Sequence, residues 1–330
     1  MRIGLWGAGG IAKVHARHAA RLPGVSLVVY DRDPQRASEL AGTHGGATAE
    51  SDADLMGQAD AIVICLPTDL HAVAAETALR ASRPVLVEKP MVRHLAEADF
   101  LVDLSRQTGT PLVPAHVVRF FADYEAMHQQ IKRGAVGQIA TARIRRGGKA
   151  PLGSDAWFRN PERSGGVLLD LAVHDFDWLL WTLGPVTRVD SRSRWLGGGS
   201  TETGDFALTT LTFASGALAH VESTWMDPSG FSVSVEVAGS DGVVAYDSRA
   251  TAGLRTHTEA GSTAATPRAD ADDPYFRQMK AFVAAARGET PPAVTAEEGR
   301  DALAVALAAV QSATERRPVS LSARIIAGLS

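Results

Sequence analysis

The first third of the sequence alternates short, continuously apolar runs with stretches whose apolar residues recur at helical spacing. A strand that is apolar on both faces is buried on both faces, and a parallel sheet with helices on each side provides that burial. The connections are long enough for the helix that a parallel crossover needs. The pattern therefore predicts a doubly wound, parallel α/β sheet within residues 1–118. The predicted strands are 2–7, 25–31, 59–67, 84–90 and 111–118.

The rest of the sequence has a different pattern. After a predicted helix at 119–133, segments rich in Thr, Val and Ser alternate with turns such as "SG" and "SDG". This is typical of an open, mostly antiparallel sheet with the opening helix on one side. With a length of 330 residues, it predicts a second, α+β domain over 119–330. Two points stay open: whether the polar segment 256–273 is a mobile loop or a lid, and whether the C-terminal helix at 296–315 packs back on the N-terminal domain.

The charge and cysteine content narrow the range of partners and compartments. With 37 acidic and 33 basic residues, nothing predicts binding to nucleic acid or to an anionic membrane. A single cysteine, Cys65, excludes an internal disulfide and fits a reducing compartment. Met1 and Arg2 lead directly into the first strand without a signal peptide's apolar core, and no run of about 18 apolar residues occurs. We therefore expect a soluble, cytoplasmic protein.

The end of the first strand carries a glycine pattern that predicts a dinucleotide site. Gly7 and Gly9 belong to Gly-x-Gly-x-x-Ala, between a predicted strand and a predicted helix. The first glycine permits a tight turn, the second lets a pyrophosphate approach the backbone, and the helix N-terminus attracts its charge. The pattern predicts a Rossmann dinucleotide-binding domain. The predicted contacts in this loop are Gly7, Gly9, Gly10, Ile11 and Ala12.

Asp31 ends the second strand, 24 positions after Gly7, near the spacing at which a carboxylate binds the ribose 2′-hydroxyl. The same carboxylate would repel a 2′-phosphate, so NAD is favoured over NADP. Arg32 has two open roles in cofactor binding, which are stacking on adenine and helping to admit that phosphate.

Two further predicted strands end in polar residues at the edge where such sheets bind ligands. "VLVEKP" ends in Glu88 and Lys89, and "CLPTDLH" carries Thr68 and His71. A lone lysine is usually a surface residue, but Lys89 leaves the sheet at the same edge as the glycine loop, where a cation can hold a substrate oxygen. The predicted cofactor contacts from these strands are Leu66, Pro67, Thr68, His71, Glu88 and Lys89.

The segment "GGVLLDLAVHDFDWLLW", residues 165–181, places acidic and histidine side chains in an apolar helical pattern. One continuous helix would carry Asp170, His174 and Asp177 on one stripe. A helix that is apolar nearly all round is buried, so its polar stripe faces something other than bulk water. A solvated stripe and a core histidine paired with a carboxylate are the alternatives that stay open.

Four stretches match one family in the expected order over nearly the whole chain. They are the glycine loop, "EKP" at 88–90, "SGGVLLDLAVHD" at 164–175 and the C-terminal stretch 275–321. On these stretches the chain resembles the Gfo/Idh/MocA oxidoreductases, which include glucose–fructose oxidoreductase and inositol dehydrogenases. The resemblance implies a Rossmann domain joined to an α/β domain whose open sheet often mediates dimers or tetramers.

The resemblance also implies that Lys89, Asp170 and His174 surround the reacting carbon. These residue types suit the chemistry, because a carbinol hydroxyl must lose its proton as hydride leaves the same carbon. A neutral imidazole at His174 would act as the base. Asp170 would bind a second hydroxyl and raise the basicity of the histidine, and Lys89 would stabilise the developing alkoxide.

Several other residues are weaker candidates. His116, Arg119 and Trp157 are predicted substrate contacts because they lie near the end of the last Rossmann strand or before the "SGG" stretch. Asp175 and Asp177 are assigned no chemistry and are expected to cap strands or pair with arginines.

Two clusters are given ordinary structural interpretations. His15 and His18 share a helix face, but no third ligand is evident, so no metal site is predicted. The basic run 143–149 is interpreted as a solvated strand end rather than an anion site.

The sequence thus predicts an NAD(P)-dependent dehydrogenase or reductase acting on a secondary hydroxyl of a sugar, a sugar acid or a cyclic polyol. Two alternatives stay open. One is an NAD-dependent glycoside hydrolase of the same fold, and the other is a non-catalytic, dinucleotide-sensing regulator. We expect a homo-oligomer formed through the open C-terminal sheet.

Overall fold

The computed structural model describes residues 1–149, 157, 160–195, 205–258, 261–265 and 272–321. The chain divides into two compact units. The first contains Met1–Val117 together with Asp272–Arg300, and the second contains Val118–Ala271 with Asp301–Ser330. The segment 272–300, placed in the second domain by the sequence analysis, therefore belongs to the first unit.

The first unit is built on a six-stranded parallel sheet in the order β3-β2-β1-β4-β5-β6. This confirms the doubly wound sheet predicted from the apolar runs. The strand β3 was not predicted, because its two residues are exposed and make no apolar run. The strands are β1 (Arg2–Trp6), β2 (Ser26–Tyr30), β3 (Ala47–Thr48), β4 (Ala61–Ile64), β5 (Val85–Val87) and β6 (Leu112–Pro114).

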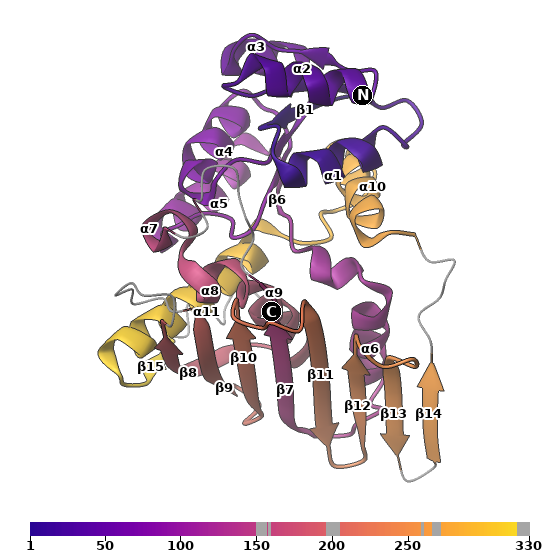
Figure 1. Cartoon of the computed structure of the whole chain (residues 1–330), viewed down its shortest axis with the longest axis vertical. Coiled ribbons are helices and arrows are strands. Elements are labelled where there is room, and N and C mark those ends of the chain that lie inside the picture. Colours follow the sequence, from indigo (N-terminus) through magenta and orange to yellow (C-terminus); the bar gives the residue numbers. More distant parts are fainter. Residues whose placement is uncertain (150–156, 158–159, 196–204, 259–260, 266–271, 322–330) are drawn as a thin grey trace. The chain divides into compact units, whose positions relative to one another are not determined.

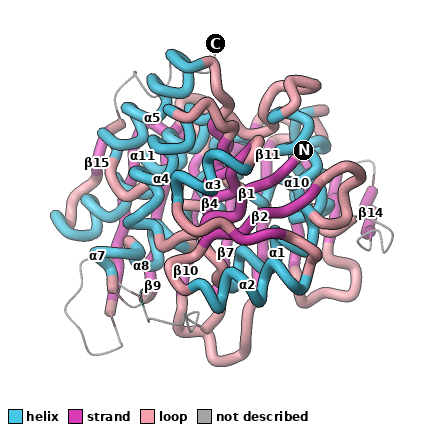
Figure 2. The backbone as a smooth tube through the Cα atoms, turned by 90° about the horizontal axis from the view of Figure 1, so that it is seen from above, coloured by secondary structure: helices cyan, strands magenta, loops and turns pink. Residues whose placement is uncertain are grey.

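Helices cover both faces of this sheet, and Figure 2 shows α1 and α2 on one side of β1 and β2 and α3 on the other. Asp33 caps α2 by accepting hydrogen bonds from the backbone N–H groups of Gln35 and Arg36, and Pro34 begins the helix, as the sequence predicts. The helices of the unit are α1 (Gly10–Ala19), α2 (Pro34–Thr43), α3 (Asp52–Gln58), η1 (Thr68–Leu70), α4 (His71–Arg80), α5 (Leu95–Thr108) and α10 (Pro274–Ala286).

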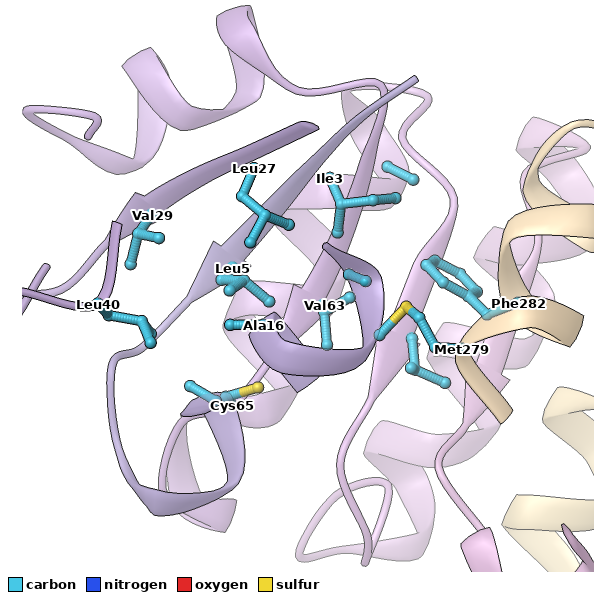
Figure 3. Packing of buried hydrophobic residues seen from close by; sticks show 14 of the residues in the cluster. Ile3, Leu5, Ala16, Leu27, Val29, Leu40, Val63, Cys65, Met279 and Phe282 are labelled. Atoms are coloured by element: carbon cyan, nitrogen blue, oxygen red, sulfur yellow. The ribbon is translucent and has the colours of Figure 1, made fainter. Parts of the chain in front are cut away.

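The core of the first unit includes side chains from both ends of its sequence. Ile3 and Leu5 of β1 pack with Ala16 of α1, and Met279 and Phe282 of α10 complete the same cluster (Figure 3). Burying a side chain as large as Phe282 contributes roughly 1.5–3 kcal/mol. This burial explains why a segment so late in the sequence forms part of the first unit.

The second unit contains a nine-stranded sheet in the order β14-β13-β12-β11-β7-β10-β9-β8-β15 (Figure 1). Its pairs are antiparallel apart from β7 with β10, which is parallel, so the predicted mostly antiparallel sheet is confirmed. The strands are β7 (Ile139–Gly147), β8 (Val186–Arg194), β9 (Phe206–Phe213), β10 (Leu218–Thr224), β11 (Ser232–Gly239), β12 (Gly242–Asp247), β13 (Leu254–Thr258), β14 (Gly261–Ala265) and β15 (Val319–Ser320).

The prediction of a polar loop at 256–273 is wrong at 256–258 and 261–265, where β13 and β14 pair as antiparallel strands. Thr256 pairs with Thr263 and His257 with Ser262. An edge hairpin that is exposed to solvent can be polar throughout, and Thr favours strands, so composition alone concealed it. Residues 259–260 and 266–271 of the predicted loop lie outside the described residues.

The helices of the second unit include α6 (Ala122–Lys132), close to the predicted helix 119–133. Among the described residues, none of the helices combines the length and apolar character needed to cross a membrane. The other helices are η2 (Val117–Phe120), α7 (Pro161–Ser164), α8 (Gly166–Asp170), α9 (Val173–Leu183) and α11 (Ala296–Glu315), whose first turn belongs to the first unit.

Candidate active site

The glycine loop between β1 and α1 leaves room for a phosphate group. Gly7 has a φ of +103°, and a Cβ there would lie 2.6 Å from the carbonyl oxygen of Cys65, so no other residue fits. Gly9 is the N-cap of α1, and Gly10 has nothing within 4 Å of the position of a Cβ. Ala12 is fully buried, which explains the small residue at the third position of the pattern. The loop thus has the close backbone approach and helix N-terminus that a dinucleotide pyrophosphate needs.

Asp31 connects the glycine loop to the turn that follows β2. Its Oδ2 accepts a hydrogen bond from the backbone N–H of Ala8 at 2.7 Å, and its Oδ1 accepts one from Asp33 at 3.0 Å. These bonds fix the carboxylate at the end of the strand while the residue stays partly exposed. A fixed carboxylate at this place suits the two hydroxyls of an adenosine ribose. Arg32 beside it is exposed.

A cation that the sequence did not predict lies at the glycine loop. Arg36 of α2 places its Nη2 3.8 Å from the position of a Cβ on Gly9. An arginine at that distance suits recognition of a phosphate group. The sequence shows only that a basic residue follows Asp33 by about one helical turn. This spacing occurs in many helices, so it did not mark Arg36 as a phosphate contact.

Lys89 is the second residue after β5 and follows Glu88, whose carboxylate contacts a buried histidine. Glu88 is 9% exposed, and its Oε1 lies 2.7 Å from Nε2 of His15. Burial opposes the charged form of this carboxyl group, but hydrogen bonding and attraction from His15 and the charge of Lys89 lower the pKa of Glu88. The loop that holds Lys89 is therefore anionic at its first residue.

The prediction that His71 contacts the cofactor needs a correction. His71 is 1% exposed, and its ring nitrogens lie 3.0 Å from the carbonyl oxygen of Pro90 and 2.9 Å from that of Leu66. Burial lowers its pKa. Both ring nitrogens face carbonyl oxygens inside the fold, and a neutral imidazole donates to one of the two, so the ring joins two loops instead of contacting a cofactor. Thr68 is also buried, and Pro67 is the N-cap residue of η1.

The predicted single helix over 165–181 is wrong, because Leu171 and Ala172 separate α8 from α9. Asp170 is the last residue of α8 and His174 the second of α9, so the two lie on opposite sides of the break. Asp170 is 3% exposed, whereas His174 is half-buried. Leu171 and Ala172 keep right-handed helical dihedrals, and the backbone N–H of Ala172 bonds to Val167 five residues back, so the break is a local distortion of one turn.

Asp175 of α9 forms a buried ion pair with Arg146 of the underlying strand β7. Arg146 of β7 donates to both carboxylate oxygens at 2.7–3.0 Å, and its Nη2 also donates to the Tyr124 hydroxyl at 2.9 Å. Burial raises the pKa of Asp175, and the neighbouring guanidinium works in the opposite direction. The residue next to His174 is thus fixed to the sheet.

Asp177 forms a second buried pair, with Arg119 of η2. Arg119 donates from Nε and Nη2 to the two carboxylate oxygens at 2.9 and 2.7 Å, and both side chains are at most 5% exposed. The expectation that Asp175 and Asp177 pair with arginines is confirmed. The prediction that Arg119 contacts substrate needs a correction, because its Nε and Nη2 donors already bind the Asp177 carboxylate inside the fold.

The other candidate contacts lie in both units. His116 is 1% exposed and belongs to the first unit, as Lys89 does. Trp157 is half-buried and belongs to the second unit, as Asp170 and His174 do. Among the described residues, no group of three or more His, Cys, Asp or Glu side chains could hold a metal ion.

The basic run 143–149 is not a solvated strand end throughout. Successive side chains of β7 point to opposite faces, so Arg146 lies under α9 while Arg145 bonds to Glu222 and Asp227. Arg143 pairs with Glu236 on the exposed side. The run was misinterpreted because ion-pair partners come from distant strands.

The fold and the glycine loop define an oxidoreductase with an NAD-binding Rossmann unit. Residues 1–116 match the model of the oxidoreductase family with an NAD-binding Rossmann fold, and residues 124–245 match the C-terminal domain of the same family. The chain belongs to the Gfo/Idh/MocA family of oxidoreductases.

Similar proteins include a dehydrogenase and a reductase. Inositol 2-dehydrogenase of Rhizobium meliloti (strain 1021) is 30% identical to this chain, over 98% of this chain and 99% of that protein. The 1,5-anhydro-D-fructose reductase of Ensifer adhaerens is 30% identical, over 94% and 96%. The crystal structure of GenD2 from gentamicin A biosynthesis, in complex with NAD, superposes with a TM-score of 0.88 at 25% identity and covers 98% of this chain and 96% of that one.

Proposed function

We propose that this protein is an NAD-dependent dehydrogenase of a neutral polyol, with a cyclic, inositol-like polyol as the leading substrate class. The observation that carries the proposal is the half-buried His174, which lies beside a break between α8 and α9 and next to the fixed Asp175. A histidine held in this way is available for proton transfer. The inositol 2-dehydrogenase similarity supports the substrate class.

Each residue of the catalytic set has one role in this proposal. His174 takes the proton from the reacting hydroxyl, and NAD, when bound, accepts the hydride. Asp170 accepts a hydrogen bond from a neighbouring hydroxyl, and Lys89 donates to the oxygen that gains negative charge. The glycine loop and Asp31 hold the cofactor, with NAD preferred over NADP because of the carboxylate.

The charges of the second unit favour a neutral substrate over a sugar acid. Arg119 and Arg146 would be natural partners for a substrate carboxylate. Both instead form buried bidentate ion pairs with Asp177 and Asp175.

The test is reduction of NAD in the presence of myo-inositol, other cyclic polyols, aldoses and aldonic acids, followed by the absorbance of the reduced nicotinamide. We expect turnover with a cyclic polyol and little with the acids. Turnover of aryl glycosides without net reduction would instead indicate a hydrolase. Tight NAD binding without turnover in either direction, including keto-polyols with NADH, would indicate a regulator.

We also propose a homo-oligomer formed through the face of the second sheet opposite its helices. Leu208 and Leu218 lie on neighbouring strands and are 38% and 46% exposed. Leu208 pairs with Glu222 and Leu218 with Thr212, so the two leucines lie four positions apart on one face, and a second copy that covers this face would bury both. Light scattering during size-exclusion chromatography tests this, and Leu218→Lys should reduce the mass. A cytoplasmic location is a proposal that rests on the single, buried Cys65.

A further inference from the structure

Two buried histidines hold the residues on either side of Lys89. His15 contacts Glu88 at 2.7 Å, and His71 contacts the carbonyl oxygen of Pro90 at 3.0 Å. We propose that His15, acting through Glu88, is a positioning residue for Lys89, and that His71 gives the same loop a second support. The proposal rests on the proposed function only in taking Lys89 as a catalytic residue.

The Glu88 carboxylate is fixed at both of its oxygens. Oε1 contacts Nε2 of His15, and Oε2 accepts the backbone N–H of Lys89 at 3.2 Å. The backbone N–H of Glu88 donates to Ile64 of β4 at 3.1 Å. A carboxylate held in this way fixes the peptide between Glu88 and Lys89, and with it the origin of the lysine side chain.

The surroundings of His15 assign its proton. Nδ1 is buried and has no hydrogen-bond partner among the described residues, and the whole side chain is 0% exposed. An N–H group at Nδ1 would be a buried donor without an acceptor, which is costly. We therefore assign the proton to Nε2, where it is donated to Glu88. Glu88 stays ionised in this arrangement, consistent with its lowered pKa.

The two histidines connect Lys89 to the cofactor-binding elements. His15 lies in α1, the helix whose N-terminus borders the glycine loop. His71 begins α4 and also contacts the carbonyl oxygen of Leu66, in the loop after β4. The position of the lysine is thereby set relative to both loops predicted to hold NAD. A displacement of about 1 Å at a reacting group can cost about 100-fold in rate.

The helix α1 also offers a matched control. His18 lies three residues after His15 and is likewise buried, at 2% exposure. Its Nε2 lies 3.3 Å from Asp273, and its ring stacks on Tyr275. Tyr275 also lies edge-on to the His15 ring at a centroid distance of 6.1 Å, so both substitutions affect the contact of α1 with α10, but of the two histidines only His15 contacts Glu88.

The test compares His15→Phe, His15→Gln and His18→Gln in the full chain. Phe keeps the ring but removes the donor, whereas the Gln amide nitrogen can reach the position of Nε2. Hydrogen exchange of a peptide covering residues 88–92 reports the loop without any substrate, and a peptide covering β1 is its reference. NAD binding by titration calorimetry and kcat with the active polyol complete the comparison.

We expect His15→Phe to speed exchange at 88–92 about fivefold or more, with β1 unchanged. We expect its kcat to fall about 10–100-fold while the Kd for NAD changes less than about threefold. His15→Gln should bring the exchange rate at 88–92 and the kcat back to within about threefold of the wild-type values. His18→Gln should leave both near the wild-type values, even if it lowers the Tm.

Unchanged exchange at 88–92 in His15→Phe would overturn the proposal, and so would equal effects of His15→Gln and His15→Phe. If His15→Phe does not fold, Glu88→Gln replaces it, because an amide has only one acceptor oxygen for the two donors. If exchange at 88–92 is faster in His15→Phe but the wild-type protein turns over no polyol, the positioning role is supported and the proposed function is rejected. The two failures are therefore distinguishable.

Discussion

Arg146 and Asp175 form a buried bidentate ion pair that fixes α9 to the sheet at the residue next to His174. The guanidinium is 6% exposed and the carboxylate 0%. Tyr124 completes the arrangement by accepting a hydrogen bond from the same guanidinium. Buried pairs of this kind add little net stability relative to apolar residues, but the loss of one partner leaves an uncompensated charge.

Replacing Arg146 by Met should therefore destabilise the protein strongly. Asp175 would remain buried without its partner, and the expected loss in the free energy of unfolding is about 3–5 kcal/mol. Denaturant unfolding followed by tryptophan fluorescence measures this loss. The double variant Arg146→Met, Asp175→Leu should recover a large part of it, because no unpaired charge is then buried at this site.

Arg143→Met is the matched control, since Arg143 lies on the same strand and pairs with Glu236 at the surface. An exposed pair contributes about 0–1 kcal/mol. Equal losses for the two variants would contradict the assigned difference between the buried and the exposed pair.

Asp31→Asn should shift the cofactor preference toward NADP. The amide oxygen can still accept the N–H of Ala8, whereas the negative charge that repels a 2′-phosphate is removed. We expect the ratio of the NADP and NAD dissociation constants to fall about tenfold, corresponding to about 1.4 kcal/mol. Calorimetric titration of both cofactors checks this, and an unchanged ratio would contradict the role given to Asp31.

Arg36→Gln should weaken binding of both cofactors by a similar factor. The guanidinium near Gly9 lies where a pyrophosphate common to NAD and NADP would bind. We expect the two dissociation constants to rise about 5–20-fold and the effect to shrink at high salt. Arg32→Gln, at the neighbouring exposed arginine, is the comparison, and a larger effect there would transfer the phosphate role to Arg32.

The parallel sheet was predictable because its strands are buried on both faces, so burial appears directly in the sequence as continuous apolar runs. The glycine loop was predictable for a similar reason, since close backbone approach demands glycine at Gly7 whatever the rest of the chain does. Both signals are local, and both were confirmed in the fold.

The break between α8 and α9 and the partners of the polar residues were not predictable in this way. The spacing of Asp170, His174 and Asp177 is helical, and nothing local marks Leu171 as a helix end. The ion pairs join residues far apart in sequence, 29 positions for Arg146 with Asp175. Sequence patterns of one segment contain no information on such partners.

His174→Ala should abolish most turnover and leave the fold intact. Loss of a general base reduces the rate by about 100–10,000-fold, whereas a half-buried side chain contributes less to stability than a core residue. We expect NAD binding within about threefold of wild type. Single-turnover kinetics with calorimetry separates the two effects, and near-normal rates would refute the base role of His174.

The stability of the protein should fall as the pH drops from 6.5 toward 4, in part because of His128. Burial lowers the pKa of His128 from 6.5 to about 4. The unfolded chain therefore binds a proton in this range that the folded protein excludes, which favours unfolding. The expected contribution is on the order of 1–3 kcal/mol, fully present above pH 6.5 and lost by about pH 4.

His128→Gln isolates this contribution, because Gln has no group that titrates in the range and can still bond to Thr182, the partner of the His128 ring at 3.1 Å. The ring stacks on Trp181 with a centroid distance of 3.5 Å, so the variant also loses a stacking contact at every pH. The difference between the unfolding free energies of wild type and variant should consequently shrink between pH 7.5 and 5. A difference that stays constant over that range would assign the acid sensitivity to other groups, such as the buried His71, whose pKa is also lowered.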